Sequence, residues 1–86
     1  MRLQRSERFK RDFQGLPATI QRRAEKQLLL FVNNPAHPSL RIKKMQGQPG
    51  IWEGRVTRKY RFTFELQNDS CILRRIGTHD ILEASP

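Results

Sequence analysis

The sequence predicts an α+β fold in which a short N-terminal strand and two helices precede a small, largely antiparallel sheet, with both helices on one face of that sheet. Two observations lead to this prediction. Apolar residues recur at helical spacing in the first 34 residues, and from residue 51 onward they alternate with polar residues as in strands. Because 86 residues suffice for one modest core, residues 1–86 are expected to form a single domain.

The first part of the chain contains the signals of one strand and two helices. Residues 2–5 are a short strand candidate. Ser6 is suited to cap a helix that Gly15 ends, and Pro17 suits the first turn of a longer helix that ends near Asn33. The apolar residues expected on the buried faces of these helices are Phe9, Phe13, Leu16, Ile20, Ala24, Leu28 and Phe31.

The middle of the chain is predicted to be mostly loop. The apolar run at residues 28–32 is wider than one helical stripe requires, which indicates either extra packing or a surface for a partner protein. Pro38 favours a loop in which His37 is a solvated surface residue. Residues 40–45 are a candidate edge strand, and residues 47–50 form a turn.

The region from residue 52 to residue 82 is predicted to be a meander of three antiparallel strands. Residues 51–57, 60–67 and 71–76 have strand patterns, with turns between them. The alternation places Arg55 and Arg61 on the face opposite the aromatic residues. His79 follows the last strand, so we expect its imidazole to lie beside these arginines.

The charge of the chain indicates a polyanionic partner, although a solvated basic surface is the simpler interpretation. Seventeen Lys and Arg residues against eight Asp and Glu residues give a net charge of +9, and the calculated pI is 11.1. The cations are concentrated between residues 41 and 61, where Glu53 is the only acid. These cations are Arg41, Lys43, Lys44, Arg55, Arg58, Lys59 and Arg61.

Other features narrow the function classes. Cys71 is the only cysteine, so an internal disulfide is excluded and a buried position in a strand is expected. The sequence has neither a long apolar run nor an apolar N-terminus, which favours the cytoplasm and no membrane contact. Histidine, cysteine and carboxylate residues do not cluster with metal-ligand spacing, so we expect no metal and no cofactor.

The order of these elements, with the motifs W-x-x-R, Y-R-F-T-F and R-R-I-G-T-H-D, resembles the RelE/ParE toxin superfamily of bacterial and archaeal toxin-antitoxin systems. The resemblance covers nearly the whole chain. It implies an mRNA interferase that cuts messenger RNA in the ribosomal A site, inhibits translation and is neutralised by a cognate antitoxin. Two alternatives stay open: an inhibitor of DNA gyrase of the ParE type, and a non-catalytic basic protein that binds nucleic acid.

The resemblance also implies roles for individual residues. Arg61 matches an arginine at the scissile phosphate, His79 matches a terminal catalytic histidine, and Arg55 matches a catalytic lysine. Glu53 stands at another lysine position, so this charge reversal makes it an uncertain base. A glutamate that YoeB-type members use as base, upstream of the tryptophan, has no counterpart here. The cations expected to contact RNA or the ribosome are Lys43, Lys44, Arg58, Lys59 and Arg75.

The expected chemistry follows from RNA itself. Without a metal, the substrate's 2′-hydroxyl attacks the phosphorus, which requires a base, cations around the phosphorane and an acid for the leaving 5′-oxygen. Histidine suits proton transfer because its ordinary pKa of about 6.5 lies near working pH. Arginine suits the phosphorane because its planar guanidinium can donate to two oxygens at once.

Overall fold

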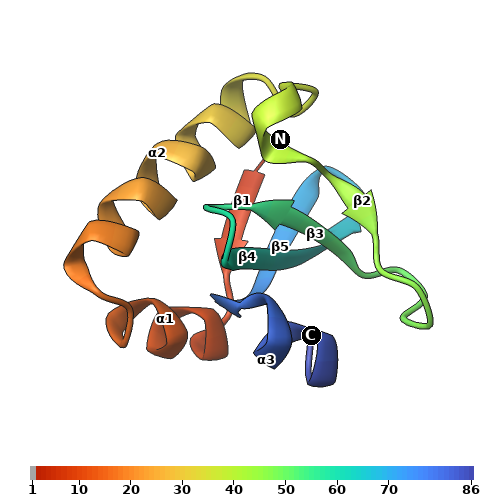
Figure 1. Cartoon of the computed structure of the whole chain (residues 1–86). Coiled ribbons are helices and arrows are strands. Elements are labelled where there is room, and N and C mark those ends of the chain that lie inside the picture. The colour runs from red at the N-terminus through yellow and green to blue at the C-terminus, as the bar shows by residue number, and fades with distance from the viewer. Residues whose placement is uncertain (1) are drawn as a thin grey trace.

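The computed structural model describes residues 2–86 and contains one five-stranded sheet with strand order β1-β5-β4-β3-β2 (Figure 1). β1 runs parallel to β5, and the other neighbouring strands are antiparallel. The predicted fold class is therefore confirmed. The elements are β1 Arg2–Arg5, α1 Glu7–Gln14, α2 Ala18–Asn33, a 3₁₀ helix Pro38–Leu40, β2 Lys43–Lys44, β3 Trp52–Arg55, β4 Tyr60–Gln67, β5 Ser70–Thr78 and α3 His79–Ala84.

The first two helices begin and end where their capping residues predict. The Ser6 hydroxyl accepts the Phe9 N–H at 3.0 Å, which satisfies a free donor in the first turn of α1. Gly15 ends α1, and its N–H donates to the Asp12 backbone carbonyl at 3.1 Å. Pro17 immediately precedes α2, and Asn34 follows its last residue.

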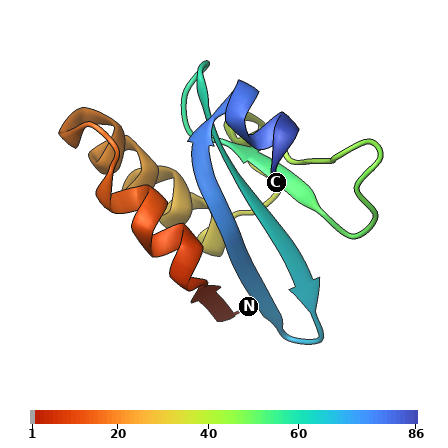
Figure 2. The ribbon, with the colours of Figure 1, turned by 90° about the horizontal axis from the view of Figure 1, so that it is seen from below.

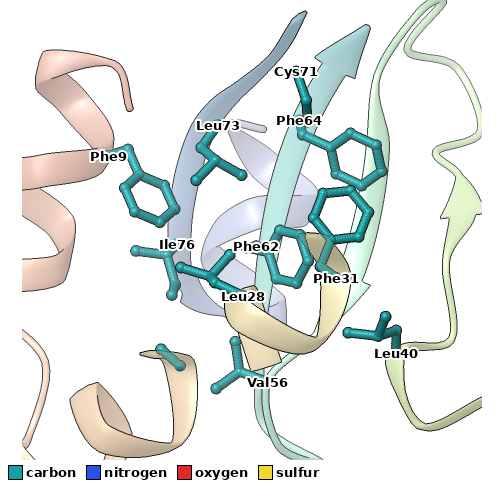
Figure 3. Close-up of a cluster of buried hydrophobic side chains, with 11 residues drawn as sticks. Phe9, Leu28, Phe31, Leu40, Val56, Phe62, Phe64, Cys71, Leu73 and Ile76 are labelled. Carbon is teal, nitrogen blue, oxygen red and sulfur yellow. The ribbon is translucent and has the colours of Figure 1, made fainter. Parts of the chain in front are cut away.

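The main core lies between these two helices and one face of the sheet. Phe31 of α2 packs against Phe62 and Phe64 of β4, with ring centroids 5.5 and 4.9 Å apart (Figure 3). Phe9 of α1 belongs to the same buried cluster. Phe62 and Phe64 face α2, so Arg61 and Thr63 face the opposite side of the sheet.

A third helix, which the sequence analysis did not predict, covers part of that opposite side. α3 packs on β4 and β5, away from α1 and α2 (Figure 2). The Thr63 hydroxyl donates to the Pro86 carbonyl at 2.9 Å, and Leu82 of α3 is buried. The signal for α3 is Thr78, whose hydroxyl accepts the Ile81 N–H as an N-cap.

The predicted strand at residues 40–45 is largely wrong. Pro38–Leu40 forms a 3₁₀ helix, and Arg41 has a left-handed backbone with φ of 45°. An extended strand cannot pass through that conformation, so only Lys43–Lys44 pairs with β3. β3 is also shorter than predicted, whereas β5 is longer.

The wide apolar run in α2 is only partly used for packing. Leu28 and Phe31 are buried in the core. Leu29, by contrast, is 65% exposed and Val32 is 41% exposed. The packing interpretation therefore accounts for only part of this run.

Candidate active site

Two arginines from neighbouring strands form the centre of the candidate site. Arg55 of β3 lies directly opposite Arg61 of β4 in the antiparallel register. Residues opposite each other in such a pair project to the same face, so both guanidinium groups lie on the side away from α2. Gln27, buried in α2, donates to the Arg55 carbonyl at 2.9 Å and so ties the end of β3 to the core. The prediction that Arg55 and Arg61 lie on the same face of the sheet is confirmed.

His79 reaches this site because β5 passes directly into α3. The His79 N–H donates to the Lys59 carbonyl at 2.8 Å, which joins the start of α3 to the turn before β4. His79 and Arg61 line the same open pocket, whose volume is about 540 Å³. The other lining residues are Arg58, Lys59, Thr78 and Asp80. The imidazole and the central guanidinium thus converge as the strand pattern predicted.

Backbone carbonyls hold the Arg61 guanidinium. Its Nη1 donates to the carbonyls of Thr57 and Arg58 in the preceding turn. Burial and the neighbouring Arg55 lower the pKa of Arg61, while Glu53 opposes this shift. An arginine remains protonated under all these influences, so the site presents a fixed positive charge.

Glu53 is a buried carboxylate among cations. Its side chain is 4% exposed, with Lys43 Nζ 3.7 Å and Arg61 Nε 3.8 Å from the same oxygen, Oε1. A buried charge is costly unless it is paired, and here two cations offset that cost. Glu53 therefore lies at the middle of the positive site, and its burial there could not be inferred from its position in the sequence.

His79 has different surroundings at its two ring nitrogens. Nε2 lies 3.2 Å from Glu83 Oε1, one helical turn further along α3. Nδ1 is buried, and no residue of the described range 2–86 forms a hydrogen bond with it. Because Nδ1 is buried, Nε2 is the nitrogen through which the imidazole can meet a substrate.

Four of the cations predicted to contact RNA lie on two sides of Arg61. Lys43 and Lys44 are exposed on the edge strand β2, and Lys44 Nζ lies 5.4 Å from the centre of the Trp52 ring. Arg58 and Lys59 are exposed in the turn between β3 and β4. Lys43 contacts Glu53 on the face of Arg61, whereas Lys44, which is paired with Trp52, lies on the opposite face with Phe64.

The prediction for Arg75 needs correction, because the structure gives this residue a different environment. Its Nε and Nη2 each donate to the Asp12 carboxylate at 2.9 Å, and Nη1 donates to the Ser85 carbonyl at 3.2 Å. The hydrogen bond to Asp12 raises the pKa of Arg75. With its side chain only 15% exposed, Arg75 joins α1 to β5 and has little left to offer a phosphate.

The structure adds two arginines to the site. Arg23 of α2 and Arg41 line a pocket of about 390 Å³ together with Arg55 and Arg58. Arg41 belongs to the basic run noted in the sequence, which was the available signal. Arg23 offers no such signal because it lies in a helix far from that run.

The structure also brings together three possible metal ligands. Donor atoms of Glu53, His79 and Glu83 all lie within 4.8 Å of one another. They are separated in sequence by 26 and 4 positions, and only the second interval, from His79 to Glu83, is one that helical metal sites use. The sequence analysis did not find this set, because the fold and not the sequence spacing brings Glu53 to the other two residues.

Comparison with known proteins yields structural matches alone. The sequence matches no family model and no curated protein. Among solved structures, YafQ of E. coli strain BL21(DE3) has a TM-score of 0.74 and 18% identity, covering 95% of this chain and 98% of that chain. A YoeB/ParE toxin from Agrobacterium tumefaciens has a TM-score of 0.75 and 16% identity, with coverages of 92% and 99%.

A third match extends the similarity to an archaeal complex. A chain of the RelB-RelE antitoxin-toxin complex from Methanococcus jannaschii has a TM-score of 0.74 and 24% identity, covering 95% of this chain and 98% of that chain. The protein has the RelE/ParE toxin fold. At such low sequence identities a shared fold does not establish a shared activity, so the activity is inferred from the site residues. Among the described residues, the helices include none that is long and apolar enough to cross a membrane.

Proposed function

We propose that this protein is the toxin of a type II toxin-antitoxin system and that it cleaves messenger RNA in the ribosomal A site without a metal. The observation that supports this most directly is the shared pocket of Arg61 and His79, with Arg58 and Lys59 at its edge. A pocket that combines an imidazole with several fixed cations suits a phosphodiester better than a neutral substrate.

In the proposed reaction, the RNA 2′-oxygen bonds to the phosphorus and the bond from phosphorus to the 5′-oxygen breaks. Arg61 and Arg55 stabilise the phosphorane, because both guanidinium groups lie on the face where that charge develops. His79 gives a proton to the leaving 5′-oxygen. Glu53 is the carboxylate on this face of the sheet, within 4.8 Å of the imidazole, and in this proposal it takes the proton of the 2′-hydroxyl. The products are a 2′,3′-cyclic phosphate and a free 5′-hydroxyl.

We further propose that a cognate antitoxin neutralises the protein. Proteins of this fold have been solved as the DinJ-YafQ complex of E. coli and the RelB-RelE complex of Methanococcus jannaschii. A net charge of +9 favours a partner with an acidic segment, because complementary charge speeds association and selects the partner. Co-expression of a small acidic protein encoded beside this gene should restore growth.

The test of catalysis is induced expression in a bacterial host, with growth and primer extension on a reporter mRNA as readouts. Wild-type protein should arrest growth and give codon-linked cuts. His79→Ala should lower cleavage about 10²–10⁴-fold, the usual contribution of a general acid or base. Arg61→Ala should also restore growth, because the phosphorane then loses a fixed charge.

Matched controls use the same residue types outside the site. His37→Ala changes the other histidine, which lies in the loop before the 3₁₀ helix, and Arg22→Ala changes an exposed arginine of α2. Both should arrest growth as the wild type does. Continued toxicity of His79→Ala and Arg61→Ala contradicts the proposed site. Growth arrest without mRNA cuts but with relaxed plasmid favours gyrase, and no growth effect at all favours a non-catalytic protein.

A further inference from the structure

Three residues beside the proposed pocket have the composition of a transition-metal site. His79 and Glu83 lie one turn apart on α3, and Glu53 comes from β3. Their donor atoms lie within 4.8 Å of one another. One imidazole nitrogen with two carboxylate oxygens is a donor set that zinc accepts, with water completing the coordination.

The pair on α3 is already arranged for chelation. Residues four apart on a helix share one face, the spacing used by two histidines in helical zinc sites. His79 Nε2 and Glu83 Oε1 are 3.2 Å apart. Two ligands bound to one zinc ion at about 2.1 Å in tetrahedral geometry are about 3.4 Å apart. The helix therefore presents these two ligands with nearly the required separation.

Glu53 is the ligand that must change partners. The atoms of the cluster that are furthest apart must close by about 1.4 Å to reach that separation. Glu83 is 56% exposed and free to move, whereas Glu53 is buried and contacted by Lys43 and Arg61. Both cations repel a metal ion, so only an ion with strong affinity for nitrogen can compete. That requirement favours Zn²⁺, Ni²⁺ and Cu²⁺ over Mg²⁺ and Ca²⁺.

Other potential soft ligands are unsuited to compete. Cys71 is fully buried, and burial raises the pKa of its thiol to about 11, so it stays protonated at neutral pH. His37 lies in another loop, where its Nδ1 contacts the Ser39 hydroxyl at 2.9 Å.

We propose that His79, Glu83 and Glu53 bind one divalent transition-metal ion, with Zn²⁺ as the representative ion. The proposed cleavage reaction does not use this ion. The ion would occupy the imidazole nitrogen and draw Glu53 away from Lys43 and Arg61. Water molecules complete its coordination sphere.

The test is isothermal titration calorimetry of the whole chain with ZnCl₂, together with the absorption spectrum of the Co²⁺-loaded protein. Wild-type protein should bind one ion. Glu83→Gln and Glu53→Gln should each weaken binding at least about tenfold, since even the outer partners of metal ligands contribute that much. Circular dichroism confirms that each variant is folded.

Two further variants separate this site from adventitious binding. His37→Gln should leave the affinity unchanged. Lys43→Gln should tighten binding by at least about fivefold, because two unit charges about 4 Å apart in water interact by about 1 kcal/mol and the metal ion carries two charges. The proposal is overturned if Glu83→Gln binds Zn²⁺ as well as the wild type, if His37→Gln abolishes binding, or if Lys43→Gln fails to tighten it.

Binding of Zn²⁺ should also inhibit cleavage, and this expectation rests on the proposed function. The binding measurement itself does not depend on the proposed function. If His79 transfers a proton during cleavage, a bound Zn²⁺ ion removes its nitrogen from that role and inhibits the enzyme. Inhibition is measured as the ratio of cleavage rates with and without Zn²⁺, for wild type and for Glu83→Gln, each against its own metal-free rate. The ratio should fall toward one in the variant. Binding without inhibition refutes the catalytic role of His79 and leaves the metal site intact.

Discussion

Gly54 shows how one small residue allows the sheet to pack closely behind the site. It lies directly opposite Phe62 in the register of β3 and β4. A Cβ atom added there would lie 2.2 Å from the Phe62 ring and 2.9 Å from Ile42 Cδ1. Since real atoms do not approach so closely, the glycine is required by the position of the ring and not by its own backbone.

We therefore expect Gly54→Ala to destabilise the fold by about 1–3 kcal/mol, the usual cost of overpacking a core. The measurement is the free energy of unfolding from urea denaturation. Gly77→Ala is the matched control, because a Cβ at Gly77 would meet nothing within 4 Å. Its free energy of unfolding should change by less than about 0.5 kcal/mol. Equal effects of the two substitutions would contradict this explanation.

Residue types explain much of the candidate site but not all of it. Alternation along β3 and β4 was enough to place Arg55 and Arg61 on one face, because strand side chains have a period of two. The same rule places Glu53 on that face as well. Its burial, and its pairing with Lys43 and Arg61, depend on how the neighbouring elements cover it.

At the scale of elements, the contact between α1 and β5 closes a sheet edge that would otherwise be free. β1 pairs with β5 only as far as Leu73. Beyond that point, the Asp12 carboxylate of α1 accepts the Ile76 N–H at 3.2 Å and also binds Arg75 through two bonds. The Asp12 side chain thus accepts the backbone N–H that a neighbouring strand would otherwise pair with, and it binds a guanidinium as well.

Asp12→Asn should lower the free energy of unfolding by about 2 kcal/mol, since hydrogen bonds to charged groups contribute about 1.5–3 kcal/mol. Glu25→Gln is the matched control. It breaks the ion pair of Arg5 and Glu25, in which the two side chains are 35% and 55% exposed. Exposed pairs contribute at most about 1 kcal/mol, so the control should change stability little. Thermal unfolding followed by circular dichroism measures both, and a larger loss for Glu25→Gln would refute the role of Asp12.

Elements at chain turns were the least predictable part of the fold. The strand predicted for residues 40–45 does not form over its whole length, because Leu40 ends a 3₁₀ helix and Arg41 adopts a left-handed backbone. α3 was missed because its six residues are too few to show helical periodicity. Both short elements border the site, where they place Lys43 and His79.

At the scale of the whole molecule, the basic charge is distributed along one route across the surface. Neighbouring pockets share Arg41, Arg55, Arg58 and Arg61, so the cations form a continuous band from α2 to α3. One of these pockets includes Glu53, and a further pocket beside Lys43 includes both Glu53 and Glu83 of the proposed metal site. Such a band suits a single RNA strand that passes the pocket.

We expect binding of single-stranded RNA to weaken with salt, with a slope of log K against log salt of about −3 if four phosphates are contacted. The measurement is fluorescence anisotropy with the His79→Ala protein, which should not cut the RNA. Arg58→Gln should reduce the slope by about 0.7, because one counterion-releasing contact is lost. Arg22→Gln, on the exposed side of α2, should leave it unchanged. A slope near zero would contradict binding through this band.

The sequence by itself determined the order of β1, α1, α2 and the meander of β3, β4 and β5, together with the caps of α1 and the shared face of Arg55 and Arg61. These features follow from local rules: strand and helix periodicity, capping hydroxyls and turn residues act over a few positions. The similarity to known toxin structures confirms the fold at that level.

Only the tertiary structure decided which distant residues meet. The pairing of Asp12 with Arg75, the burial of Glu53 and the cluster of Glu53, His79 and Glu83 depend on strand register and on where α1 and α3 pack. Such contacts join positions far apart in the chain, and their energies depend on burial that no local pattern records. The sequence therefore specified which face of a strand or helix each side chain occupies. The packing of the helices on the sheet decided which of these side chains contact one another.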